Sequence, residues 1–174
     1  EELCAGKKDI VIISSDHTRP VPSRVTMPIL LHHIHSAAPE ARVRILVATG
    51  MHRPSTHEEL VNKYGEEIVA NEEIIMHVAT DDSMMKKIGT LPSGGECIIN
   101  KIAADCDLLL AEGFIEPHFF AGFSGSRKSV LPGIASYKTI MYNHNGQFVN
   151  DSHSRAGNLC HNHVSEDMFA AAEM

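Results

Sequence analysis

Short apolar runs alternate with helical patterns along this chain, and this alternation limits the possible folds more than any other feature of the sequence. Asp9–Ser15 and Arg42–Ala48 have the β-branched, apolar composition of strands that are buried on both faces. Between them, a helical pattern starts near Ser23 and ends at Pro39. Three later segments continue the pattern: a strand over Ile74–Ala79, a hairpin over Lys87–Asn100 and a strand over Asp107–Ala111. The alternation predicts a Rossmann-like α/β fold, with a mostly parallel sheet and helices on both faces.

The size and the charge of the chain narrow the classes of protein to consider. A chain of 174 residues is long enough for one domain with a real core. The net charge of −7 disfavours nucleic acid and anionic membranes as partners, and no apolar run approaches the ~20 residues of a membrane helix. The four cysteines form no C-x-x-C pair, as expected for reduced thiols in the cytoplasm. The chain lacks a starting Met and stops inside an apparent helix, so we expect residues 1–174 to be one α/β domain cut from a larger protein.

Polar residues follow the first predicted strand, where parallel sheets bind their ligands. The strand leads directly into Asp16, His17, Thr18 and Arg19. Arg19 could hold a phosphate or carboxylate while Asp16 orients a neighbouring side chain. Alternatively, the segment serves only to cap the helix that follows. The residue types alone leave both interpretations open.

A similar loop follows the second predicted strand. Gly50 permits a ligand to approach the backbone closely, and His52 would then point into a cleft. The alternative is a tight turn with a histidine in solvent. Ser55 or Thr56 is expected to cap the next helix.

The stretch from Gly113 to Ala135 is rich in small and aromatic residues and fits neither of two familiar motifs. A phosphate-binding P-loop needs glycine immediately before Lys128, where Arg127 stands. A nucleophile elbow needs Gly-x-Ser-x-Gly, but the run that begins at Gly122 ends in Ser126. What remains is an Arg-Lys pair near His118, with Phe119, Phe120 and Phe123 close by. Aromatic walls could lower the pKa of Lys128 and make it nucleophilic, whereas the alternative is a solvated pair on a surface loop.

The chain contains 12 histidines, and most of the others offer little chemistry. His144 follows a helical stretch and, taken alone, is best explained by an interaction with the helix dipole. His32, His33 and His35 are expected to be solvated, and His57 and His77 show no partner in the sequence. The C-terminal group of His153, Cys160, His161 and His163 has no zinc-site spacing.

Four segments taken together resemble the lactate racemase family. They are Ser15–Pro20, Ala48–Pro54, Pro117–Gly133 and Asn143–Asn145, and in order they extend across most of residues 9–146. The resemblance implies racemisation or epimerisation of a 2-hydroxyacid, either lactate or a related acid. The implied chemistry is hydride transfer to a nickel-pincer nucleotide, a pyridinium-3-thioamide-5-thiocarboxylic acid mononucleotide with nickel.

The same resemblance assigns roles to individual residues. It places the covalent tether of the cofactor at Lys128 and the nickel ligand of the protein at His144. It makes His52 and His118 the two catalytic histidines that transfer protons. Two imidazoles with near-neutral pKa values suit a reaction that runs in both directions at one pH. The remaining cofactor-binding residues would be Asp16, His17, Thr18 and Arg19.

The resemblance also implies partners and a missing part. We expect a small-molecule 2-hydroxyacid substrate and cofactor-maturation enzymes as partners. The full chain of the family is more than twice this length, so this would be a fragment of the cofactor-binding N-terminal domain, without the C-terminal domain that closes over the substrate. Such a fragment is expected to be inactive and to lack its cofactor. Ser126 departs from the family pattern, which has glycine at this position beside the tether.

Two other functions compete with this interpretation. The first is a zinc- or iron-dependent hydrolase that uses His52, His118 and His144 as its metal ligands. The second is a non-catalytic phosphate-binding module built from Arg19, Arg127 and Lys128.

Overall fold

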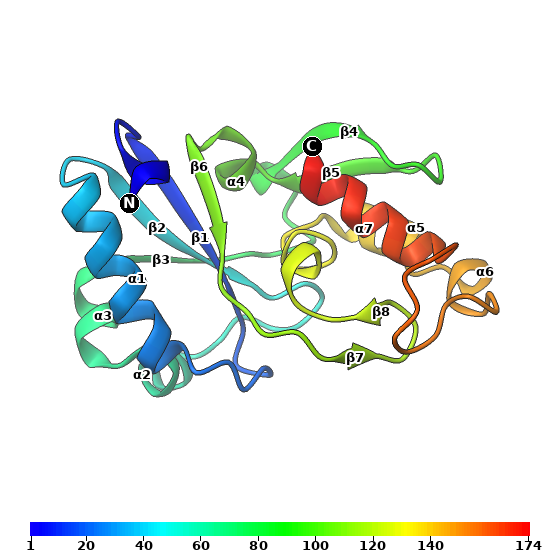
Figure 1. Ribbon diagram of the computed structural model, residues 1–174, viewed down its shortest axis with the longest axis horizontal. Coiled ribbons are helices and arrows are strands. Elements are labelled where there is room, and N and C mark those ends of the chain that lie inside the picture. Colours follow the sequence, from blue (N-terminus) through cyan, green and yellow to red (C-terminus); the bar gives the residue numbers. More distant parts are fainter.

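The computed structural model describes all residues from Glu1 to Met174 and is organised around a parallel four-stranded sheet (Figure 1). The strands stand in the order β3-β2-β1-β6, and every neighbouring pair is parallel. Their bounds are Asp9–Ser15 for β1, Arg42–Ala48 for β2, Glu73–Met76 for β3 and Leu108–Ala111 for β6. The α/β fold with a parallel sheet is therefore confirmed. The first two strands have their predicted bounds, while β3 ends before Ala79.

The sheet separates two apolar cores because successive side chains of a strand point to opposite faces. Ile10 and Ile12 of β1 belong to one core, and Val11 and Ile13 belong to the other. The first core is covered by three helices, which lie together on one side of the sheet in Figure 1. They are α1 (Ser23–Ala37), α2 (His57–Tyr64) and α3 (Glu66–Asn71). Thr56 caps α2 in a capping box with Glu59, as expected from the sequence.

The second core is covered by short elements rather than by long helices. An antiparallel hairpin confirms the turn predicted within Lys87–Asn100 and comprises β4 (Met85–Thr90) and β5 (Glu96–Asn100). The remaining elements on the chain are η1 (Glu2–Cys4), η2 (Asp82–Met84), α4 (Lys101–Asp105), β7 (Pro117–His118), β8 (Gly122–Phe123), η3 (Ser126–Ser129), α5 (Tyr137–Asn143), α6 (Gly146–Val149) and α7 (His163–Glu173). Helix α7 supplies Val164, Met168 and Ala171 to this core. None of the helices combines the length and apolar character that crossing a bilayer requires.

His77 corrects one expectation from the sequence, because it is fully buried and has two partners. Its Nε2 lies 3.0 Å from the carbonyl oxygen of Ala135 and donates to it, and its Nδ1 accepts from the side-chain amide of Asn100 at 3.3 Å. A nitrogen that accepts a hydrogen bond carries no proton, so the ring is neutral. Burial lowers the pKa of His77 to about 4 in agreement with this. The ring ties the end of β3 to the segment that follows η3.

The strand order also predicts where a ligand binds. From β1 the chain proceeds to β2 and then β3 on one side, whereas β6 pairs with the other edge of β1. In sheets of this kind the crevice lies beyond the carboxyl ends of the strands, where the order reverses. Here that point lies between β1 and β6, above Ser15 and Ala111.

Candidate active site

A cavity of about 380 Å³ opens at this end of the sheet. Its volume lies in the range of ~300–1,000 Å³ that is typical of small-molecule sites. The strand ends contribute Ser15, Ala48 and Glu112 to its lining. Six of the eight site residues predicted from the sequence also line it: Asp16, Arg19, His52, His118, Lys128 and His144. The other two, His17 and Thr18, lie outside the lining and contact the residues that support it.

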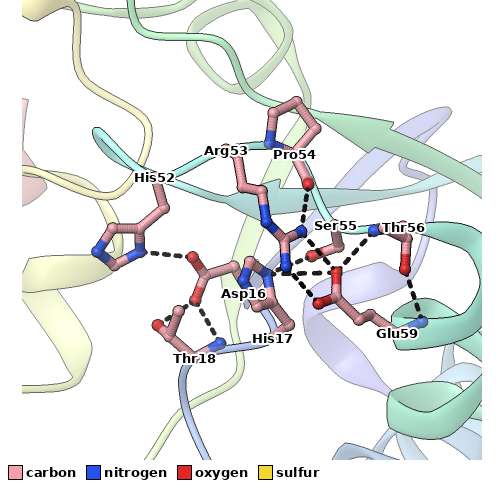
Figure 2. Close-up of polar contacts among 9 residues, drawn as sticks. All are labelled: Asp16, His17, Thr18, His52, Arg53, Pro54, Ser55, Thr56 and Glu59. Atoms are coloured by element: carbon pink, nitrogen blue, oxygen red, sulfur yellow. Dashed lines mark hydrogen bonds and ion pairs between the residues drawn. The ribbon is translucent and has the colours of Figure 1, made fainter.

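Asp16 and His52 form a hydrogen-bonded dyad between the loops after β1 and β2 (Figure 2). Asp16 is buried, and one carboxylate oxygen lies 2.6 Å from Nδ1 of His52. The other oxygen accepts from the backbone amide and the hydroxyl of Thr18, at 3.1 and 2.6 Å. Burial favours the protonated carboxyl, but the hydrogen bonds from Thr18 and His52 outweigh this and hold the pKa of Asp16 below its usual value.

The dyad fixes the orientation of the His52 ring. Because Nδ1 of His52 donates to Asp16, Nε2 is the nitrogen left free for a ligand. The expectation that Asp16 orients a neighbour is confirmed. Capping is not its role, since helix α1 begins after Pro22 with no side-chain cap.

Glu59 holds the loop after β2 on the side of Asp16 away from the His52 ring (Figure 2). It binds both terminal nitrogens of Arg53, at 2.6 and 2.8 Å, and accepts from the backbone amide of Thr56 at 2.7 Å. His17 lies 3.1 Å from the hydroxyl of Ser55 and 3.8 Å from Glu59. These contacts cross-link the loop that carries Asp16 to the loop that carries His52.

The arginines of these two loops, Arg19 and Arg53, differ in their contacts. Arg53 is held by Glu59 and does not line the cavity, whereas Arg19 lines it and its guanidinium has no partner in the chain. A free guanidinium matches the geometry of a carboxylate or phosphate. Arg19 is therefore the residue of this half of the site that can bind an anion.

His118 lies on the opposite wall of the cavity, in the β7–β8 hairpin. Its ring stacks on Phe119 and meets Phe120 edge-on, with ring centroids 4.6 Å apart in both pairs. The backbone amide of Ala121 donates to its Nδ1 at 3.2 Å. Burial, followed by the positive charge of Lys128, lowers the pKa of His118 to about 4. The ring is therefore neutral in the unliganded protein, with its proton on Nε2.

Lys128 lies on η3, with its Nζ 5.7 Å from the ring centroid of Phe120. Burial, together with the charges of Arg19 and Arg127, lowers the pKa of this lysine to about 8. A substantial fraction of the amine is thus unprotonated near neutral pH and can act as a nucleophile. The alternative of a solvated Arg-Lys pair is wrong, because only 6% of Arg127 is exposed.

His144 directly follows α5, and its Nδ1 is buried with no hydrogen-bond partner. Burial and the nearby charge of Lys128 lower its pKa to about 4, which leaves a lone pair available. Its ring meets Phe120 edge-on at 5.1 Å, so Phe120 contacts His118, Lys128 and His144 together. A buried unpaired nitrogen requires an explanation, and a metal ligand role supplies one.

Glu112 is the site residue that the sequence interpretation missed. It follows β6 directly and lines the cavity. Its carboxylate accepts from the hydroxyls of Ser14 and Ser23 at 2.8 Å each, and from Thr26. These bonds join the start of α1 to the ends of β1 and β6. Its position offered a signal, because Glu112 follows β6 as Asp16 follows β1.

The histidines of the cavity do not form a metal site of their own. Nowhere does the chain bring together three or more His, Cys, Asp or Glu side chains that could hold a metal ion. A zinc site needs three or four protein ligands. The hydrolase alternative, with His52, His118 and His144 as ligands, therefore fails on geometry.

Comparison with known proteins agrees with this geometry. A family model described as the lactate racemase N-terminal domain matches residues 1–157. The chain belongs to the lactate racemase family. Within it, a lactate racemase from Lactiplantibacillus plantarum is 73% identical over 172 residues, and one from Thermoanaerobacterium thermosaccharolyticum is 54% identical over 173 residues. Both alignments cover 99% of this chain and 41% of the relative.

Solved structures extend the comparison to three dimensions. The lactate racemase apoprotein from T. thermosaccharolyticum superposes with a TM-score of 0.97 at 54% identity, over 99% of this chain and 41% of that one. A Thermotoga maritima protein superposes with a TM-score of 0.82 at 22% identity, over 99% of this chain and 44% of its own, and supports the fold alone. The chain thus spans about two fifths of the length of its lactate racemase relatives.

Proposed function

We propose that this chain provides the cofactor site and both proton-transfer histidines of an isomerase that racemises lactate or a related 2-hydroxyacid. The observation that carries the proposal is the convergence of His52, His118, Lys128 and His144 on one cavity. Family membership supports racemisation, while the roles of the individual residues rest on the geometry of the cavity.

The residues fit a nickel-pincer nucleotide tethered to Lys128. The lowered pKa of Lys128 favours covalent attachment at its amine. His144 offers a single unpaired imidazole, and imidazole is a suitable nickel donor. Because no other protein ligands gather there, a bound nickel must take its other donors from the nucleotide. When bound, this group would accept a hydride from the substrate carbon and return it to either face.

The chain's own residues would then hold the substrate and move its hydroxyl proton. His52 is set to accept that proton at Nε2, because Asp16 engages its Nδ1–H and stabilises the imidazolium that forms. His118 is set in the opposite tautomer, with Nε2–H able to donate a hydrogen bond. Arg19 can bind a carboxylate or phosphate. Phe119 and Phe120 shield the wall around His118 from water.

Racemisation requires the two histidines to exchange roles according to the enantiomer that is bound. His118 is held neutral partly by nearby cations. A bound anion that neutralises Lys128 or Arg19 raises the pKa of His118. The ring can then take up a proton at Nδ1, which releases its hydrogen bond from the amide of Ala121, and the resulting imidazolium can pass its Nε2 proton to the substrate oxygen. The site thus becomes more symmetric once it is loaded.

Intact mass and nickel content test the proposal. The full-length protein, produced together with cofactor-maturation enzymes, should carry an adduct of the nucleotide mass and about one nickel per chain, and should racemise either enantiomer of lactate. Lys128→Ala should lose the adduct, the nickel and the activity. Lys138→Ala is the matched control, because that lysine is exposed, pairs with Glu96 and does not line the cavity. An unmodified wild-type mass after maturation would refute the proposal.

The phosphate-module alternative is less favoured, because one of its three cations is already engaged. Arg127 is buried and donates to oxygens of the protein rather than facing a ligand. Only Arg19 and Lys128 line the cavity.

A further inference from the structure

Arg127 is a buried cation with no acidic partner. Only 6% of the residue is exposed, and it takes part in no salt bridge. Buried charges are normally paired, because removing a charge from water is costly. Burial lowers the pKa of Arg127, but an arginine remains charged at any physiological pH. A costly arrangement of this kind beside Lys128 calls for a specific role.

The guanidinium of Arg127 joins two segments that are far apart in the sequence. Its Nη2 donates to the carbonyl oxygens of Ala121 and Phe123, at 3.0 and 3.4 Å, and to the hydroxyl of Ser165 at 3.1 Å. Its Cζ lies over the ring of Phe169, 4.4 Å from the ring centroid. Ser165 and Phe169 lie four residues apart on one face of α7. The guanidinium therefore clamps the β7–β8 hairpin against α7.

A single residue, Ala121, connects this clamp to the ring of His118. The carbonyl of Ala121 accepts from Arg127, and the amide of the same residue donates to Nδ1 of His118. Fixing Ala121 therefore fixes both the orientation and the tautomer of the His118 ring. Arg127 also directly precedes Lys128, so the same clamp holds the backbone from which that side chain extends.

We propose that Arg127 is a positioning residue that fixes the tautomer of His118 and the backbone at Lys128 by clamping the β7–β8 hairpin to α7. The inference rests on the proposed function, in which these two residues act. Arginine is needed because a planar guanidinium can stack on Phe169 while it donates to several oxygens. All three hydrogen bonds come from Nη2, and Nε has no partner, so lysine keeps the charge and can keep part of these bonds, but it has no planar group to place over the ring of Phe169.

The test compares Arg127→Lys with the wild type in the full-length, matured protein. We expect kcat to fall by about tenfold or more, as when partners that orient a functional group are lost, with KM little changed. In cofactor-free protein, the ¹⁵N shifts of His118 should change from a single tautomer to a mixture. Arg155→Lys is the matched control, because Arg155 is exposed and its side chain has no partner, so it should leave both readouts unchanged.

Two milder variants keep the inference falsifiable if Arg127→Lys does not fold. Ser165→Ala removes one acceptor and Phe169→Leu removes the stacked ring. Both should shift the His118 spectrum in the same direction, with smaller losses of kcat. A folded Arg127→Lys protein with an unchanged His118 spectrum would overturn the inference, whatever its activity, and so would unchanged spectra in both milder variants.

The same experiment separates this inference from the proposed function. A wild-type protein that carries nickel and racemises lactate, with variants that leave His118 unchanged, refutes the clamp alone. A wild-type protein that acquires no adduct, with a His118 tautomer that still depends on Arg127, refutes the function and leaves the clamp standing.

Discussion

The two walls of the cavity hold their histidines in opposite surroundings. On the strand-end wall, the side chain of His52 is 50% exposed and donates a hydrogen bond to the buried carboxylate of Asp16. On the hairpin wall, His118 is half-buried among phenylalanine rings, and the charges nearest to it are positive. One ring is therefore held by a carboxylate, and the other is kept neutral by burial and by nearby positive charges.

The difference follows from how each wall is built. Ser15 and Ala48 are paired neighbours in the sheet, so Asp16 and His52 are brought together by the register of β1 and β2. The hairpin wall has no such frame. Its side chains are placed by packing around Phe120 and by the hydrogen bonds of Arg127. The strand-end wall should therefore tolerate changes in packing that disable the hairpin wall.

Asp16→Asn should produce the largest effect and act on the strand-end wall alone. The amide would present an N–H to Nδ1 of His52 and stabilise the wrong tautomer, with its proton on Nε2. The loss of kcat should lie between about 10² and 10⁴, by analogy with the same substitution in other Asp–His pairs. Steady-state kinetics with both enantiomers, in the matured full-length protein, would measure it.

The chain offers a matched control for this change. Asp151 contacts Nδ1 of His153 at 3.0 Å in an exposed pair outside the cavity. Asp151→Asn should leave kcat unchanged. Equal losses in the two variants would show that the Asp16–His52 dyad has no special role.

Phe120→Leu should act on the hairpin wall alone, with a smaller effect. The loss of the ring admits water to Lys128, so the pKa of this lysine should rise from about 8 toward the ordinary 10.5. Each unit of rise lowers the unprotonated fraction, and with it the attachment rate at neutral pH, about tenfold. Labelling of Lys128 with an amine-reactive reagent as a function of pH, read by mass spectrometry, would report the pKa directly.

Phe119→Leu is the control for the packing argument. Phe119 also stacks on His118 but is 75% exposed, so its removal should change the Lys128 titration much less. If both variants shift the titration equally, packing around Phe120 is not what lowers the pKa.

The same contrast explains which parts of the molecule could be predicted from the sequence. The bounds of β1 and β2 and the β4–β5 hairpin follow from local composition and turn chemistry, and they were predicted correctly. The Asp16–His52 dyad was predicted only in part. The position of each loop after a parallel strand indicates that the two loops lie close together, but it does not indicate which of their side chains bond to each other.

The burial of Arg127 and the role of Glu112 could not be predicted in this way. Arg127 depends on Ser165, 38 residues later, and Glu112 depends on Ser14, 98 residues earlier. No local pattern encodes such contacts. From the residues alone, His144 was also best explained as a helix-end histidine, and only the family resemblance and its buried, unpaired Nδ1 favour a ligand role.

The smallest effect we predict is on stability in acid, because the two walls should lose their contributions to stability over different pH ranges. The pKa values of His77 and His118 are lowered to about 4 in the folded protein, against an ordinary value of 6.5. Between these values the unfolded chain binds more protons than the folded one, so stability should fall as the pH falls from about 6.5 to 4. Asp16 is a carboxylic acid whose pKa is lowered in the folded protein, so its contribution to stability is lost only as the pH falls below its ordinary value of 3.8.

Denaturant midpoints measured between pH 7 and pH 4 would show this dependence. His77→Gln should lower the number of protons taken up on unfolding by up to about one, because the native ring is fully buried. The cavity should stay intact in this variant. His118→Gln should remove less, because that ring is only half-buried. Asp16→Asn should not change how stability depends on pH above pH 4. That result would assign the acid sensitivity between pH 6.5 and 4 to the hairpin wall and the adjoining core. A stability that does not vary between pH 6.5 and 4 would mean that these two rings, and that of His144 whose pKa is also lowered to about 4, take up protons as readily in the folded state as in the unfolded chain, and the contrast between the walls would then fail.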